Sequence, residues 1–290
     1  MRPAPFEYFA PRTVEDALDL LARHGGDAKL LAGGQSLVPM MNMRLVRPAV
    51  VVDLNRVAVL GDVREEAGRL RLGALVRQHA LERDGRIAAT APLLAEAAPL
   101  IGHLQTRARG TVGGSLVHAD PAAELPACMI ALDAVFHLRS RRGQRACAAR
   151  DFFRGLLATA LAPDELLAEI EVPGAPVPRP GHGFAEVARR HGDFALAGAC
   201  AVLALDAAGV CRHARLVIFG LGDGPHLARA TAGLVGERPS AARLAEVGRA
   251  TAGEIDARGD LHATAEYRRR VAAGLAARAL GSAAARAEVA

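Results

Sequence analysis

The sequence predicts an α+β protein in two parts, with a boundary near residue 175. In the first part, short apolar runs alternate with amphipathic segments, which indicates strands interleaved with helices. Residues 173–183, "PGAPVPRPGHG", hold four prolines and three glycines, a composition typical of a linker. Beyond them, an apolar stretch that turns near Asp206–Gly209 predicts a β-hairpin, and the last fifty residues are mostly helical.

The composition of the 290 residues narrows the class of protein. Arginines are scattered, Trp is absent and Lys29 is the only lysine, so the net charge of +5 does not indicate a nucleic-acid surface. The four cysteines form no CxxC pair, which argues against a zinc or iron–sulfur framework and favours buried thiols in a reducing compartment. The chain shows neither a signal peptide nor an apolar run long enough for a transmembrane segment. We therefore expect a cytoplasmic protein.

The elements of the N-terminal part follow from local signals. In "TVEDALDLLARHGG", Thr13 is placed to cap a helix that Gly25 and Gly26 end. "AKLLAGG", "AVVVDL" (49–54) and "RLRLG" (69–73) predict strands. Helices are predicted over 74–84, 92–103 and 122–133, and strands over 134–139 and 164–173.

Two glycine turns are the strongest candidates for a binding site. "LLAGGQSLVPMM" (30–41) and "RGTVGGSLVHADPAAE" (109–124) both follow Gly-Gly with a polar residue and an apolar one. Glycine lets backbone N–H groups approach a phosphate closely, and the hydroxyls of Ser36 and Ser115 can add hydrogen bonds. Gly-Gly pairs also mark ordinary tight turns. The residues alone therefore leave two interpretations, ordinary turns or two halves of one phosphate cradle.

Other motifs are missing or incomplete. The chain has no P-loop, HExxH or G-x-S-x-G sequence. In "GLGDGP" (220–225), Pro225 takes the place of the last glycine of a dinucleotide fingerprint, so this segment is predicted to be a loop. His118 and Asp120 are candidates for a metal or acid–base pair, but neighbouring polar residues in a turn are the preferred interpretation.

Four segments together resemble one family. They are "LLAGGQSLVPMMNMRL", "QTRARGTVGGSLVHADPAAELPA", "EVARRHGDFALAG" and "GDLHATAEYRRRVAAGLAARAL". In this order they resemble the FAD-binding medium subunit of the molybdenum hydroxylases, the family of xanthine dehydrogenase and carbon monoxide dehydrogenase. The resemblance covers nearly the whole chain.

The resemblance implies a more detailed fold than the residues alone. Residues 1–175 would form a PCMH-type FAD-binding domain with subdomains of about 1–57 and 58–175. Residues 176–290 would form a C-terminal domain of the carbon monoxide dehydrogenase flavoprotein type, with a three-stranded antiparallel sheet and helices.

The resemblance also implies a set of cofactor-binding residues. The two glycine turns would together hold the FAD pyrophosphate, and Phe194, often Tyr in this family, would reach the isoalloxazine ring. The first loop has no histidine for covalent attachment, so the FAD is expected to be non-covalent. The implied residues are Ala32, Gly33, Gly34, Gln35, Ser36, Ile101, Thr111, Val112, Gly113, Gly114, Ser115, Glu124, Leu166, Leu167, Asp193 and Phe194.

The implied function is electron transfer through FAD, without catalytic residues or a metal site on this chain. A molybdopterin-type molybdenum cofactor and [2Fe-2S] clusters would belong to a large and a small partner subunit, in a dimer of heterotrimers. Two alternatives stay open. One is a free-standing FAD-dependent dehydrogenase or oxidase, with His118 or His191 as the base. The other is an assembly module without flavin.

Overall fold

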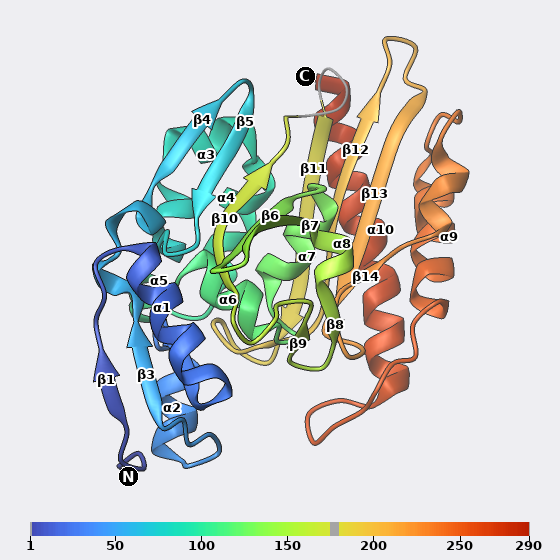
Figure 1. The fold of residues 1–290 in the computed structure, drawn as a ribbon. Coiled ribbons are helices and arrows are strands. Elements are labelled where there is room, and N and C mark those ends of the chain that lie inside the picture. Colours follow the sequence, from blue (N-terminus) through green and yellow to red (C-terminus); the bar gives the residue numbers. More distant parts are fainter. Residues whose placement is uncertain (1, 175–179, 290) are drawn as a thin grey trace.

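The computed structural model describes residues 2–174 and 180–289 and places three main sheets side by side (Figure 1). The first sheet is parallel, in the order β1 (Glu7–Phe9), β3 (Val50–Asp53), β2 (Ala28–Leu31). Helix α1 (Val14–His24) covers it with a buried apolar face, and the Thr13 hydroxyl accepts a hydrogen bond from the N–H of Asp16 at 3.0 Å, as the capping pattern predicts. The short helix α2 (Leu37–Asn42) follows the first glycine turn.

The second sheet is antiparallel and joins strands from distant parts of the sequence. Its order is β4 (Val63–Glu66), β5 (Arg69–Gly73), β10 (Leu166–Val172), β6 (Val135–Ser140), β7 (Gly143–Ala148). The helices around it are α3 (Gly85–Thr90), α4 (Pro92–Ala97), α5 (Leu104–Arg109), α6 (Val112–His118), α7 (Glu124–Ala131) and α8 (Ala149–Phe152). Strands β8 (Phe153–Gly155) and β9 (Ala158–Thr159) form a small hairpin.

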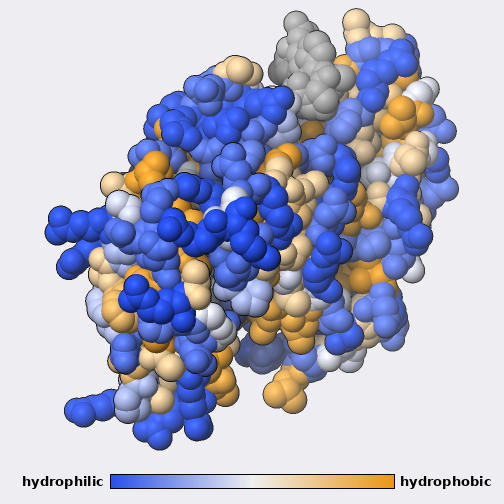
Figure 2. Space-filling view, in the orientation of Figure 1, coloured by the Kyte–Doolittle hydropathy of each residue, from blue (hydrophilic) through white to orange (hydrophobic). Residues whose placement is uncertain are grey.

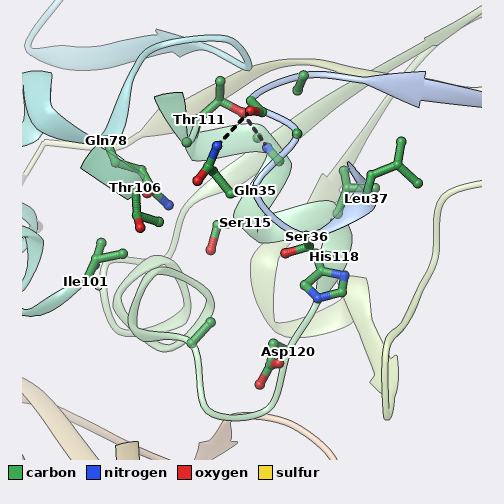
Figure 3. A pocket seen from close by; sticks show the side chains of 18 of the residues that line it. Gln35, Ser36, Leu37, Gln78, Ile101, Thr106, Thr111, Ser115, His118 and Asp120 are labelled. Carbon is green, nitrogen blue, oxygen red and sulfur yellow. Dashed lines mark hydrogen bonds between the residues drawn. The ribbon is translucent and has the colours of Figure 1, made fainter. Parts of the chain in front are cut away.

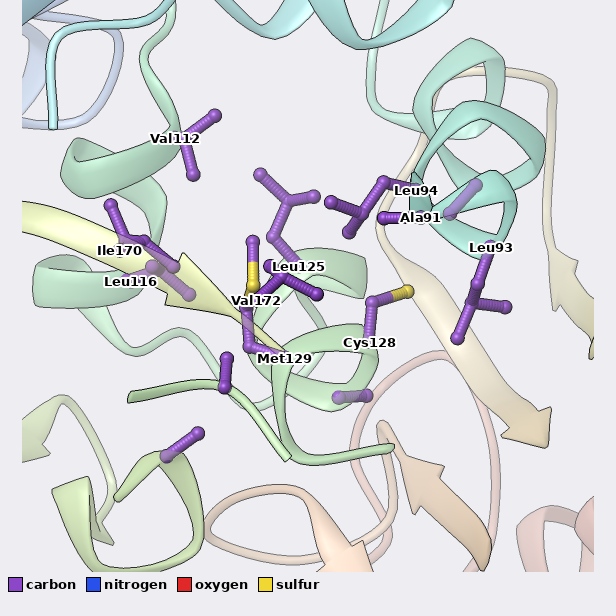
Figure 4. Close-up of a cluster of buried hydrophobic side chains, with 14 of the residues drawn as sticks. Ala91, Leu93, Leu94, Val112, Leu116, Leu125, Cys128, Met129, Ile170 and Val172 are labelled. Atoms are coloured by element: carbon purple, nitrogen blue, oxygen red, sulfur yellow. The ribbon is translucent and has the colours of Figure 1, made fainter. Parts of the chain in front are cut away.

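The core of this second part lies between the sheet and helices α4, α6 and α7. Figure 4 shows part of this core, where labelled side chains of these three helices and of β10 meet. They include Leu93, Leu94, Val112, Leu116, Leu125, Met129, Ile170 and Val172, all inaccessible to solvent. Burial of these apolar side chains is the main stabilising contribution here.

The third sheet is antiparallel and formed by β11 (Pro180–Ala188), β12 (Ala195–Leu205), β13 (Cys211–Phe219) and the two-residue β14 (His226–Leu227). The long helix α10 (Ala265–Val289) covers one face, with α9 (Ala241–Gly253) beside it. The other face packs on α7, so that Phe184, Cys200 and Phe219 share a core with the second sheet. The hairpin predicted near Asp206 is confirmed.

Three predicted elements differ in the structure. Residues 180–183 of the predicted linker belong to β11, while 175–179 lie outside the described residues. The α-helix predicted over 74–84 is wrong, because only a 3₁₀ helix over Gln78–Glu82 forms. The preceding residues form a turn whose backbone is bonded to other segments, from the Ala74 N–H to the Ala168 carbonyl and from the Val112 N–H to the Val76 carbonyl.

The helix predicted over 92–103 is shorter than expected. It ends as α4 at Ala97, and a 3₁₀ turn follows over Ala98–Leu100. Pro99 has no N–H for the helical ladder, and its ring crowds the preceding turn, so the α-helix stops before it. The remaining predictions, a helix within 122–133 and strands near 134–139 and within 164–173, are confirmed as α7, β6 and β10.

The surface of the described residues is largely polar. Figure 2 shows hydrophilic residues over the β4–β5 hairpin, with apolar residues in small separate groups. No helix in residues 2–174 or 180–289 has the length and apolar character that crossing a membrane requires.

Candidate functional site

A cavity of about 630 Å³ lies between the first two sheets, and its wall includes both glycine turns. Figure 3 shows Gln35 and Ser36 of the first turn near Ser115 of the second, with His118 and Asp120 below them. The loop between β11 and β12 completes the wall with Gly192, Asp193 and Phe194. The cavity is therefore assembled from all three parts of the fold.

The two turns pack directly against each other, which requires glycine at the contact. A Cβ at Gly33 would lie 2.3 Å from the backbone oxygen of Arg109, and one at Gly114 would lie 2.7 Å from the Thr111 hydroxyl oxygen. Gly34 has a φ of 74°, a conformation that side-chain-bearing residues rarely adopt. A side chain at Gly33 would push the two turns apart, whereas one at Gly114 would clash within the second turn.

The first turn presents unused backbone donors. Among the described residues, the N–H groups of Gly33, Gly34, Gln35 and Ser36 have no protein acceptor, while the Gln35 side-chain amide donates to the Gly33 carbonyl at 3.3 Å. Successive free N–H groups around a positive-φ glycine form a concave site for an anion. This part of the phosphate-cradle hypothesis fits the structure.

The second turn has a different arrangement, because its N–H groups are used inside the protein. The Gly113 N–H donates to the Ala74 carbonyl at 2.8 Å, the Gly114 N–H to the Thr111 hydroxyl at 3.0 Å and the Ser115 N–H to the Thr111 carbonyl at 3.2 Å. The second turn therefore offers the cavity its Ser115 hydroxyl and a close backbone surface.

A polar clamp behind the turns holds them together. The Asn55 side chain donates to the Ala32 carbonyl at 2.8 Å and accepts from the Arg77 guanidinium at 2.6 Å. Arg77 also donates to the Arg109 carbonyl, the atom on which Gly33 packs. We call Asn55 and Arg77 the turn clamp. It links the two turns through side chains that the sequence patterns did not single out.

Two carboxyl groups with raised pKa values lie at or near the site, the buried Glu124 in the cavity wall and the half-buried Glu186 behind it. Glu124, the first residue of α7, is 5% exposed, and burial together with the charge of Asp120 raises its pKa to about 7. Burial and the charge of Glu124 raise the pKa of Glu186, on β11, to about 8. Near neutral pH these groups therefore carry less negative charge than ordinary carboxylates, which lowers electrostatic repulsion toward an anionic ligand.

Phe194 lies at the cavity with its side chain 66% exposed. Its loop rests on α5, because a Cβ at the preceding Gly192 would lie 2.4 Å from the His103 ring. The rings of His103 and His191 stack with their centroids 6.4 Å apart. An exposed aromatic ring beside a cavity is available to stack on a planar ligand.

Two family models match the chain. The model described as the FAD binding domain in molybdopterin dehydrogenase matches residues 4–175, more than half of the chain. The chain belongs to the FAD-binding medium subunits of the molybdenum hydroxylases. The model described as the CO dehydrogenase flavoprotein C-terminal domain matches residues 182–283 of this medium subunit.

Individual relatives agree with the family. The medium subunit is 44% identical to the 6-hydroxypseudooxynicotine dehydrogenase complex subunit alpha of Paenarthrobacter nicotinovorans, over 77% of this chain and 75% of that protein. It is 41% identical to the caffeine dehydrogenase subunit beta of Pseudomonas sp. strain CBB1, over 78% of this chain and 76% of that protein.

Solved structures have the same fold. A chain of carbon monoxide dehydrogenase from Hydrogenophaga pseudoflava matches with a TM-score of 0.96 and 36% identity, over 99% of both chains. A chain of quinoline 2-oxidoreductase from Pseudomonas putida 86 matches with a TM-score of 0.94 and 34% identity, over 99% of this chain and 100% of that chain.

The structure places most of the predicted residues in the cavity wall. Val112 and Leu166 are the exceptions, since their side chains are fully buried in the apolar cores beside the cavity. The predicted residues that line it are Ala32, Gly33, Gly34, Gln35, Ser36, Ile101, Thr111, Gly113, Gly114, Ser115, Glu124, Leu167, Asp193 and Phe194.

Sequence reasoning missed or set aside several other wall residues. They include Lys29, Gln78, Thr106, His118, Asp120 and Leu161. Lys29 had a usable signal, because it is the only lysine in an arginine-rich chain. His118 and Asp120 share the wall, but no cluster of three or more metal-ligating side chains occurs in the part of the chain that the structure describes.

Proposed function

We propose that this medium subunit binds FAD non-covalently in the cavity and passes electrons from the iron–sulfur clusters of a partner to an external acceptor. The observation that carries the proposal is the contact between the two glycine turns, which places free N–H groups and the Ser115 hydroxyl in one wall. FAD supplies the one- and two-electron chemistry that such a relay needs.

The residues of the chain have separate tasks in this proposal. The first turn binds the pyrophosphate through its N–H groups, and the second turn supports it and adds a hydroxyl. Phe194 packs on the flavin ring, and Ile101 and Leu167 provide apolar contacts.

We also propose an assembly with a large molybdenum-binding subunit and a small iron–sulfur subunit, as a dimer of these heterotrimers in the cytoplasm. The names of the relatives support this, since they describe a subunit of a complex and a carbon monoxide dehydrogenase medium chain. The four free cysteines suit a reducing compartment.

The domain boundaries at about 57 and 175 stay part of the proposal, supported by sheets that lie within 7–53, 63–172 and 180–227.

A charge reversal at the cavity tests the FAD site. Ser115→Asp places a carboxylate in the wall, and like-charge contact at low effective dielectric costs on the order of several kcal/mol. We expect the variant, purified with its partner subunits, to contain little or no FAD. Ser240→Asp is the matched control, because Ser240 caps α9 far from the cavity and Asp is an equally good cap.

The flavin content of each protein is measured by absorbance and by acid release. Free FAD in the supernatant supports the dinucleotide site and non-covalent binding. FMN, flavin that stays with the precipitated chain, or equal FAD in both variants would contradict the proposal.

A further inference from the structure

Gln78 lies at the cavity with an amide oxygen that the protein does not satisfy. The residue is 6% exposed, and its Oε1 atom is buried without a hydrogen-bond partner. Its Nε2 atom is not among the buried side-chain atoms of the described chain that lack a partner. Buried polar atoms in native proteins almost always have partners, so a buried amide oxygen without one indicates a missing hydrogen-bond donor.

The backbone around Gln78 fixes the place of its side chain. The Gln78 N–H donates to the Gly110 carbonyl at 2.9 Å, directly before the second glycine turn. Its side chain lies against the same glycine, because a Cβ at Gly110 would be 2.4 Å from Oε1. The side chain therefore has little room to turn away from the cavity and find another partner.

The neighbours of Gln78 suggest the chemistry of the missing group. Figure 3 shows Gln78 next to Thr106, with Ile101 nearby. All three line the cavity, and none of them carries a charge. The amide has a donor and an acceptor side by side, which matches the edge of a heterocycle that offers the reverse pair. A phosphate would only accept.

We propose that Gln78 is a further cofactor-binding residue whose amide hydrogen-bonds a heterocyclic edge of FAD. The inference rests on the proposed function, because it requires FAD in this cavity. Both the flavin and the adenine have an edge of the required kind, and the experiment separates them.

The test uses Gln78→Met, which keeps the length of the side chain and removes both polar atoms. The variant is purified with its partner subunits, its flavin is removed, and the dissociation constant of added FAD is measured by fluorescence. We expect FAD to bind about 10-fold to 100-fold more weakly, the range for one or two hydrogen bonds to a neutral partner. Gln105→Met, at an exposed position on α5 outside the cavity wall, should bind FAD like the wild type.

Thermal unfolding of the flavin-free protein separates binding from a structural role. An amide oxygen without a partner contributes no hydrogen bond, so flavin-free Gln78→Met should unfold at the same or a higher temperature than the wild type. A lower unfolding temperature with unchanged FAD affinity would show a structural residue and overturn the inference. If Gln78→Met does not fold, Gln78→Leu replaces it with the same expectation.

Two fragments of the cofactor locate the contact. The affinity of ADP falls in the variant if the amide binds the adenine edge, and the affinity of FMN and the spectrum of bound flavin change if it binds the flavin edge. Equal affinities of FAD, ADP and FMN in wild type and variant would overturn the inference and leave the proposed function intact. If the wild type binds no FAD, both fail.

Discussion

At the scale of single residues, some residues of the site belong to recognisable sequence motifs and others do not. Gly33, Gly34 and Ser115 belong to motifs and are found by spacing alone. Gln78 and Asn55 belong to none, because their partners are more than twenty residues away in sequence: Gly110 for Gln78 and Ala32 for Asn55. No local pattern encodes a contact of that kind, so these residues become visible only in the fold.

Glu124 gives a prediction about pH. Its pKa is raised from 4.5 to about 7, so the folded protein holds a proton between these values that the unfolded chain has lost. The free energy of unfolding therefore falls as pH rises from about 4.5 to 7, by at most about 1.4 kcal/mol per pH unit. Glu186, with a pKa of about 8, extends the decline.

Glu124→Gln should flatten this decline and stabilise the flavin-free protein at pH 8, on the order of 2 kcal/mol. Glu7→Gln, at an exposed position on β1, is the control and should leave the profile unchanged. Chemical unfolding from pH 4.5 to 8.5 measures the effect. A Glu124→Gln profile parallel to the wild type would show that folding does not raise the pKa of this carboxyl.

At the scale of elements, helix α1 and most strands were predictable because capping residues and apolar patterns within each segment indicate them. Strand β11 was hidden because its glycines suggest a linker, yet they serve the packing of α10. A Cβ at Gly181 would lie 1.8 Å from the Ala283 carbonyl oxygen. The α-helix predicted over 74–84 was wrong because the residues in this segment favour a helix locally, but their backbone forms hydrogen bonds with a distant strand and with the second turn instead.

The turn clamp makes a prediction at this scale. Asn55→Ala removes the donor to the Ala32 carbonyl and the acceptor of Arg77, which leaves both turns without their link. We expect FAD to bind about 10-fold more weakly and the free energy of unfolding to fall by about 1–3 kcal/mol. Titration of the flavin-free protein with FAD and urea unfolding measure the two effects.

Asn42→Ala at the end of α2 is the matched control, because Asn42 lies outside the cavity wall. If Asn55→Ala loses stability but keeps full FAD affinity, the clamp stabilises the fold without positioning the turns.

At the scale of the whole molecule, the cavity depends on the joined state of the three parts. The first glycine turn follows a strand of the first sheet, and the second lies beside the second sheet. Phe194 and Gly192 join the wall from a loop of the third sheet. The shared core of Phe184, Cys200 and Phe219 with α7 fixes this arrangement. The sequence indicated an N-terminal and a C-terminal part. It did not show that a loop of the C-terminal part lines a cavity of the N-terminal part, which follows from the packing of β11–β13 on α7.

The last prediction concerns what the chain does alone. A flavin cradle exchanges electrons with a soluble acceptor but does not activate a C–H bond or hydrate carbon monoxide, which needs a metal centre or an acid–base pair. Among the described residues, His118 and Asp120 lie in the wall without a hydrogen bond to each other, and His191 stacks on His103 at the surface. We therefore expect the isolated chain, loaded with FAD, to reduce dyes from an artificial donor and to oxidise no organic substrate.

The assay follows the bleaching of flavin absorbance after addition of purines, aldehydes, N-heterocycles or carbon monoxide, with the chain alone and with its partner subunits. Bleaching by one of these substrates should occur only in the complex, because the electrons must come from a centre on another chain. A dye reduced by the isolated chain from a chemical donor proves that its flavin is active in the same sample. Rapid stoichiometric bleaching of the isolated chain by any substrate would instead show a free-standing dehydrogenase, with His118 or His191 as the first base to replace.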